Sequence, residues 1–260
     1  MKFCKLVEFK GLEDSKEGRP GLSHVKEITL FLICYVVYLL TRDLFFDQST
    51  ALQNSRLIID IERSLGILIE PSLQSWLLGA SPFLLTICNW LYIITYWPVI
   101  FGISLVLYLR DRKSYYHCRN IILINLCMAL VIFVLIPVAP PFRSLPSIMD
   151  SIQILGPIFY GGPEMSWIYN TTAALPSLHF SWTLIFGIIF VQRVRGFYRG
   201  VIVIYPVLTL YIILVTGNHF LLDAALGAVL VAVSFCLQIF HRSVKNLLKK
   251  TAANRERHYW

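Results

Sequence analysis

The feature that most constrains this chain is a series of apolar runs, each close to the length that a helix needs to cross a membrane. A helix rises about 1.5 Å per residue, so ~20 apolar residues cover the ~30 Å hydrocarbon core of a bilayer. Hydrophobic residues make up 57% of the 260 residues and charged residues only 15%. The runs are 28–46, 83–109, 120–139, 178–194, 200–217 and 220–240. The sequence therefore predicts an all-α fold, a polytopic membrane helical bundle with about six transmembrane helices. Pro98 and Pro206 interrupt two runs and predict kinks.

The segment 47–82, between the first two runs, has a different pattern. Its apolar residues recur at helical spacing and charged residues interrupt them. The apolar set is Leu57, Ile58, Ile61 and Leu65, and the charged set is Asp60, Glu62 and Arg63. This pattern predicts one or two amphipathic helices that lie along the membrane interface.

Basic residues are distributed unequally around the runs. If the runs alternate in direction, one side of the membrane holds the N-terminal segment 1–27, the loops 110–119 and 193–199, and the basic tail 242–260, with 19 of the 23 lysines and arginines. The positive-inside rule places this side in the cytoplasm. We therefore predict that both termini are cytoplasmic and that 28–241 forms one membrane domain. Because this asymmetry explains the net charge of +8, no nucleic-acid partner is predicted.

Ionisable residues gather at the opposite membrane face. His179 begins the fourth run, in AALPSLHFSW, and His219 lies between the fifth and sixth runs, in TGNHFLLD. Asp223 follows His219 by four residues, which places both side chains on one helical face. Arg143 ends the third run, in PVAPPFR. Ionisable residues at membrane depth are costly and usually functional, so this set predicts an active site at the extracytoplasmic or lumenal face.

Each of these residues alone has a structural explanation. A histidine at the end of a span is more often an interfacial anchor than a catalyst, and Arg143 can extend its charge to the interface. Asp223 can cap the N-terminus of the last span, where the helix dipole favours a carboxylate. The joint occurrence of PSLH and NHxxxD at matching span ends favours the functional interpretation. The six cysteines contain no CxxC pair and indicate neither a disulfide framework nor a zinc site.

Three motifs resemble those of the type 2 phosphatidic acid phosphatase superfamily. PSLH at 176–179 and NHFLLD at 218–223 resemble its second and third signature motifs, and APPFR at 139–143 resembles a reduced first motif. The chain is most similar to the inositolphosphorylceramide synthase-like branch, an inositolphosphotransferase group. Weaker similarity at 51–70 and 89–99 extends the resemblance over most of the chain.

The resemblance implies a phosphoryl-transfer mechanism without a metal or another cofactor. His219 would attack phosphorus and form a phosphohistidine, and Asp223 would hold the other ring nitrogen of His219. His179 would protonate the leaving oxygen and then activate water or an alcohol acceptor.

The resemblance also implies where the phosphate binds. Arg143 and the backbone N–H groups of Ser177 and Leu178, at a helix N-terminus, would contact the phosphate oxygens. Asn218, beside the nucleophile, belongs to the same substrate-binding set.

The chain departs from the phosphatase pattern at several positions. Ile136 and Ile213 replace a lysine and an arginine of the first and third motifs, and Ser144 replaces a proline. Tyr96 stands where relatives often carry histidine. These changes leave Arg143 as the one basic residue of the three motifs that can bind the phosphate, unless an arginine of the interfacial region folds over the site. The candidates are Arg42, Arg56 and Arg63.

The preferred function is an integral membrane phosphotransferase or phosphatase that acts on a lipid phosphate, namely a phospholipid, a sphingolipid-type lipid or a polyprenyl phosphate. One alternative is a metalloenzyme, with the two histidines and the aspartate as a facial triad, or a vanadate-dependent haloperoxidase-like enzyme. Another is a proton-coupled transporter, although its site is expected at the midplane rather than at one face.

Overall fold

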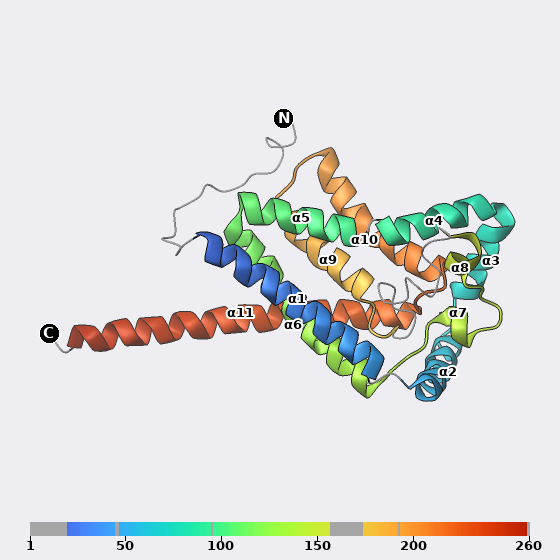
Figure 1. Ribbon diagram of the computed structural model, residues 1–260, viewed down its shortest axis with the longest axis horizontal. Helices are drawn as coiled ribbons and strands as arrows, with labels where there is room; N and C mark the ends of the chain where they lie inside the picture. The colour runs from blue at the N-terminus through green and yellow to red at the C-terminus, as the bar shows by residue number, and fades with distance from the viewer. Residues whose placement is uncertain (1–19, 45–46, 95, 157–173, 192, 259–260) are drawn as a thin grey trace.

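The computed structural model describes residues 20–44, 47–94, 96–156, 174–191 and 193–258 (Figure 1). Within these ranges the chain forms helices and contains no strand, as predicted. The bundle helices are α1 (Pro20–Leu44), α5 (Trp97–Arg110), α6 (Arg112–Leu135), α9 (Leu178–Val191), α10 (Phe197–Val215) and α11 (Leu221–His258). The remaining helices are α2 (Gln48–Ser64), α3 (Glu70–Ala80), α4 (Pro82–Ile94), α7 (Pro141–Ser144) and α8 (Ser151–Leu155). Most of the predicted N-terminal segment lies outside the described residues.

Five helical stretches are long and apolar enough to cross a membrane. They are His24–Thr41, Pro82–Arg110, Arg112–Leu135, Phe197–Val215 and Leu221–Leu248. The predicted fourth span corresponds to α9, an apolar helix of 14 residues. A helix of that length rises about 21 Å, less than the ~30 Å of the hydrocarbon core. The polytopic helical bundle is therefore confirmed, with α9 as a short sixth element.

The two prolines have different effects. Pro98 lies in the first turn of α5, where a missing N–H removes no helical hydrogen bond, and the predicted second span is divided there into α4 and α5. Pro206 lies inside α10, which continues past it. It packs against Gly187 of α9, where a Cβ atom would lie 3.2 Å from the Cγ atom of Pro206. This glycine therefore lets α9 and α10 approach closely.

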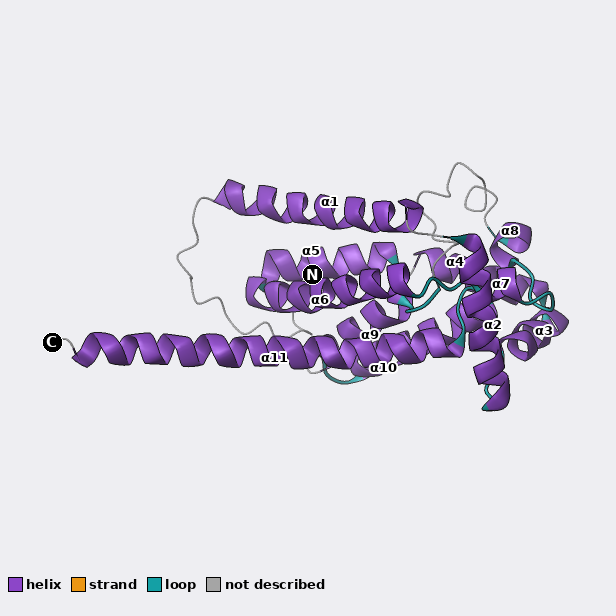
Figure 2. Cartoon of the chain, turned by 90° about the horizontal axis from the view of Figure 1, so that it is seen from below, coloured by secondary structure: helices purple, strands orange, loops and turns teal. Residues whose placement is uncertain are grey.

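Four further helices gather at one end of the molecule. In Figures 1 and 2, α2, α3, α7 and α8 lie at the end opposite the C-terminal part of α11, and α2 runs across the ends of the bundle helices. Helix α1 lies at the periphery and packs mainly on α6. Helix α11 has 38 residues and is about 57 Å long, so the predicted last span and the described part of the basic tail are one continuous helix.

Helix α2 is amphipathic, as predicted, and its buried face includes a carboxyl group. Its buried residues are Ala51, Ser55, Ile59 and Glu62. Leu57 and Leu65 are each 62% exposed, whereas Glu62 is fully buried. The exposed side also carries charged residues, because Arg63 and Asp60 pair there at 3.2 Å. Of the predicted charged set, Glu62 is therefore the member that faces the protein.

Polar side chains hold this end of the bundle together. Gln74 of α3 donates to the carbonyl oxygens of Met149 (3.1 Å) and Val215 (3.3 Å), and accepts from the Met149 N–H (2.9 Å). Asn89 of α4 donates to the Ser151 carbonyl oxygen at 2.7 Å. These bonds fasten the segment before α8 to the end of α10, where the turn with His219 begins.

Candidate active site

Backbone hydrogen bonds join the three motif segments into one unit. The Ala174 N–H donates to the Val138 carbonyl oxygen at 2.8 Å, which ties the second motif segment to the first. The Phe142 N–H donates to the Gly217 carbonyl oxygen at 3.1 Å, which ties the first segment to the third. Gly217 has a φ of +74° and lies against Ile148, so a side chain at this turn would be both strained and too close. Three distant chain segments therefore converge, as the sequence predicted.

His219 is buried, with one ring nitrogen fixed by two acceptors. Its Nδ1 atom lies 3.0 Å from the Ala174 carbonyl oxygen and 3.4 Å from the Asp223 Oδ2 atom. A carbonyl oxygen can only accept a hydrogen bond, so Nδ1 carries a proton, and in the neutral ring Nε2 has the lone pair. This tautomer suits a nucleophile that attacks through Nε2.

Asp223 lies in the first turn of α11 and has two structural partners. Its Oδ2 atom accepts the Phe220 N–H at 2.8 Å, in addition to its contact with His219. Its Oδ1 atom is buried and accepts no hydrogen bond within the described residues. Asp223 therefore caps the helix and also faces the histidine, so the two interpretations of this residue are compatible.

His179, the second residue of α9, is held by aromatic rings. The Tyr96 ring stacks on it with a centroid distance of 3.8 Å, and the Tyr92 ring with 4.3 Å. The centroids of the His179 and His219 rings are 6.0 Å apart, so one phosphoryl group can contact both. Tyr96 therefore contacts His179 directly.

Arg143 lies on the short helix α7 and its side chain is exposed. Its guanidinium carbon lies 5.9 Å from the centre of the Phe142 ring. The preceding residue, Phe142, donates its N–H to Gly217 in the turn that carries His219, so Arg143 lies next to a residue that contacts this turn. Of the other candidate arginines, Arg63 pairs with Asp60 at 3.2 Å on the exposed side of α2. The phosphate clamp stays a prediction.

One predicted phosphate contact needs correction. The Ser177 N–H donates to the Asp223 carbonyl oxygen at 3.0 Å, so it is already engaged by α11. The Ser177 hydroxyl accepts the Phe180 N–H at 3.4 Å and caps α9. Leu178 begins the helix, where an N–H has no intrahelical acceptor. The predicted donor role therefore fits Leu178 and not Ser177.

Asn218 lines the same space as the two histidines. Its side-chain nitrogen donates to the Thr216 hydroxyl oxygen at 2.8 Å. The side chain is thereby held in place beside the nucleophile.

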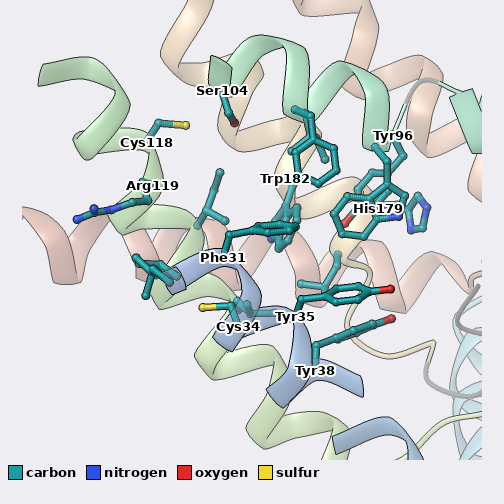
Figure 3. A pocket seen from close by; sticks show the side chains of 18 of the residues that line it. Phe31, Cys34, Tyr35, Tyr38, Tyr96, Ser104, Cys118, Arg119, His179 and Trp182 are labelled. Carbon is teal, nitrogen blue, oxygen red and sulfur yellow. The ribbon is translucent and has the colours of Figure 1, made fainter. Parts of the chain in front are cut away.

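A cavity of about 610 Å³ runs from the two histidines into the membrane region of the bundle. Figure 3 shows Phe31, Tyr35 and Tyr38 of α1 on one side of it, across from Trp182 and His179. The lining is mostly apolar and extends along α1 as far as His24. The distance along α1 from Tyr38 to His24 is about 21 Å.

The far end of the cavity is polar. Arg119 of α6 pairs with Glu27 of α1 at 2.5 Å, and the Tyr115 hydroxyl donates to the same carboxylate at 2.9 Å. These contacts tie α1 to α6 at the end away from the histidines.

Two glutamates that the sequence pattern did not single out as site residues lie behind the nucleophile. Glu62 of α2 accepts the Leu222 N–H at 2.8 Å, and Glu70 of α3 accepts the Leu221 N–H at 2.7 Å. Both side chains are fully buried. Burial raises the pKa of Glu62 to about 8 and also raises the pKa of Glu70. No local signal marked them out, because the segment 47–82 also contains the exposed acidic residue Asp60.

A metal triad needs three ligands directed at one point. Within the described ranges, no three His, Cys, Asp or Glu side chains are arranged in that way. The geometry therefore gives the metalloenzyme alternative no support.

Comparison with known proteins identifies a family for most of the chain. A family model described as the PAP2 superfamily matches residues 56–237. No curated protein and no solved structure matches the chain. The matched range begins in α2, includes the three motif segments and ends in α11, whereas α1 lies outside it.

Proposed function

The chain belongs to the PAP2 superfamily. From this premise we propose that it is a membrane phosphotransferase or phosphatase that acts on a lipid phosphate and forms a phosphohistidine at His219. The observation that supports a lipid substrate is the cavity, because it is lined mostly by apolar residues and one end of it is formed by His179, Asn218 and His219. A phosphorylated headgroup at the histidines would leave its hydrocarbon chain along α1.

The proposed reaction has two steps. The Nε2 lone pair of His219 attacks phosphorus while the bond from phosphorus to the leaving oxygen breaks, and protonated His179 gives its proton to that oxygen. His179 then accepts a proton from water or an alcohol, whose oxygen attacks phosphorus as the N–P bond breaks. Hydrolysis and transfer differ only in this second acceptor. Transfer to a polyol is the outcome that the resemblance to the inositolphosphorylceramide synthase-like branch favours.

The cavity also bears on the lipid. Its length along α1, about 21 Å, exceeds half of the ~30 Å hydrocarbon core. A chain that reaches past the bilayer midplane, such as a polyprenyl or very long acyl chain, would fill it. Helix α1 lies outside the matched family range, so we assign selectivity for the chain to α1.

The deciding experiment is capture of the intermediate. Purified protein is mixed with lipid phosphates labelled with radioactive phosphorus, quenched within milliseconds, and mapped by peptide. Acid-labile label is expected on His219. Absence of label during active turnover would indicate direct attack by water.

A cavity-filling variant tests the path of the lipid chain. Ser104→Trp introduces bulk into the cavity away from the histidines. We expect lower kcat/KM for long-chain lipid phosphates and unchanged hydrolysis of nitrophenyl phosphate. Gly102→Trp is the matched control, because this neighbour on α5 has no atom within 4 Å of an added Cβ and does not line the cavity. Equal losses in both variants would argue against a chain in this cavity.

Arg143 is proposed as the charged arm of the phosphate clamp. Its replacement by alanine is expected to cost roughly 2–4 kcal/mol of transition-state stabilisation. An unchanged kcat/KM would remove Arg143 from the clamp.

The orientation is proposed from the charge asymmetry. A cysteine introduced at Ser147 should react with a reagent confined to the extracytoplasmic side, and one at Lys113 only after permeabilisation. The reverse pattern would move the site to the cytoplasmic face.

A further inference from the structure

Two carboxyl groups from the interfacial helices hold the start of α11. The first turn of a helix has N–H groups without intrahelical acceptors. Here the acceptors come from other helices, because Glu70 of α3 takes the Leu221 N–H and Glu62 of α2 takes the Leu222 N–H. The start of α11 is therefore fixed by α2 and α3.

The same turn carries the His219–Asp223 pair. Asp223 accepts the Phe220 N–H, so three successive N–H groups donate to three carboxyl groups from three helices. A displacement of this turn would move the Asp223 oxygen that lies 3.4 Å from His219 Nδ1. Glu62 and Glu70 thus act on the pair through the backbone, without touching the histidine.

One oxygen of each glutamate lacks a donor. The Oε2 atoms of Glu62 and Glu70 are buried and accept no hydrogen bond from the described residues. The two carboxyl groups interact with each other, and Asp223 adds a further negative charge nearby. Buried charges without compensation are strongly unfavourable. A single proton between Glu62 and Glu70 removes one charge and supplies the missing hydrogen bond.

We propose that Glu62 and Glu70 are positioning residues that share one proton and hold the start of α11, and with it the His219–Asp223 pair, in catalytic geometry. The inference rests on the proposed function for its kinetic measurement. The charged groups that face Glu62 from the helices packed against it are Glu70 of α3 and Asp223 of α11.

The shared proton gives stability a defined dependence on pH. The pKa of Glu62 is raised from 4.5 to about 8, so between these values the folded protein holds a proton that the unfolded chain releases. The contribution of this proton to the free energy of unfolding is therefore fully present below about pH 4.5 and is lost as pH rises towards about 8. Above that value the slope disappears, because both states have lost the proton.

The test compares Glu62→Gln with Glu62→Ala. The glutamine keeps an acceptor for the Leu222 N–H and a donor for Glu70, so it imitates the protonated pair at every pH. We expect near-normal kcat at neutral pH, loss of the decline in kcat at about pH 8, and a smaller fall of the unfolding temperature between about pH 5 and pH 8. Glu62→Ala removes the acceptor, so kcat should fall about tenfold or more with KM little changed.

The control is Asp60→Asn, on the exposed side of the same helix, which should leave both pH profiles unchanged. The proposal is overturned if Glu62→Gln keeps the wild-type pH dependence of unfolding, or if Glu62→Ala keeps the wild-type kcat. Should Glu62→Ala fail to fold, the pH dependence of unfolding of Glu62→Gln still tests the shared proton. If the wild-type protein transfers no phosphoryl group, the proposed function is refuted, but the shared proton is still tested by the unfolding profiles.

Discussion

His219 and His179 face one cavity but are held by opposite kinds of contact. The His219 ring is fixed by hydrogen bonds to the Ala174 carbonyl oxygen and Asp223. The His179 ring lies against Tyr92 and Tyr96, and no hydrogen bond to its nitrogens occurs among the residues that the structure describes. Hydrogen bonds select one tautomer, which suits a nucleophile. Stacking fixes the plane of the ring and leaves its nitrogens able to gain and lose a proton, which suits an acid and base.

The largest effect is expected for the nucleophile. His219→Ala should lower kcat by at least about 10⁴-fold and abolish the phosphoenzyme, because the attacking atom is removed. Rapid-quench labelling measures both quantities. His241→Ala, at an exposed position of α11, is the control and should behave as wild type. Labelled protein from His219→Ala would reverse the roles of the two histidines.

Asp223 tests whether hydrogen bonding or charge dominates at His219. Asp223→Asn should lower kcat by about 10³-fold, less than an equivalent change in catalytic triads, which costs ~10⁴. The reason is that the Ala174 carbonyl oxygen still accepts the Nδ1–H. Steady-state kinetics and the rate of phosphoenzyme formation provide the measurement. A loss as large as that of His219→Ala would mean that Ala174 contributes nothing.

His179→Ala should show an effect that depends on the substrate. With a lipid phosphate, loss of the general acid should lower kcat by about 10²-fold. With nitrophenyl phosphate the first step should be nearly normal, because that leaving group departs without protonation. The breakdown of the intermediate should be slow, so that acid-labile label accumulates on His219. Equal losses with both substrates would contradict an acid role.

The stacking itself should have the smallest effect. Tyr96→Leu removes an aromatic contact worth about 0.5–1.5 kcal/mol, so kcat should fall about 2–10-fold. Tyr96→Phe keeps the ring and should remain closer to wild type. The comparison is made from kcat for a lipid phosphate at several pH values. If the phenylalanine variant loses more than the leucine variant, stacking is not what holds His179.

The positions of the helices and of the two histidines could be predicted from the sequence because they depend on local signals. Apolar runs locate the spans, and Pro176-Ser177 marks the start of α9. The four-residue spacing of His219 and Asp223 is likewise local, although His219 lies in the turn before α11 and only Asp223 lies in the helix. What could not be predicted depends on partners far along the chain. Glu62 and Glu70 lie 160 and 151 residues from the N–H groups that they accept, and no periodicity reports such a pair.

Helix α2 shows a second limit. Its helical periodicity was located correctly, but only its tertiary partners decide that Glu62, and not Asp60 or Arg63, faces the protein. Ser177 shows a third limit. Its place at a helix N-terminus predicts an N–H that binds an anion, but in the structure this N–H donates to the Asp223 carbonyl oxygen, far along the chain.

The buried carboxyl group of Glu62 limits how the protein could be redesigned to dissolve in water. It accepts the Leu222 N–H at 2.8 Å, so an apolar replacement would leave that N–H without its acceptor. Leu57, Ile61 and Leu65 are exposed and are the positions of α2 that can take polar side chains instead. A redesign that replaced Glu62 because it is buried would remove a hydrogen bond that holds the start of α11.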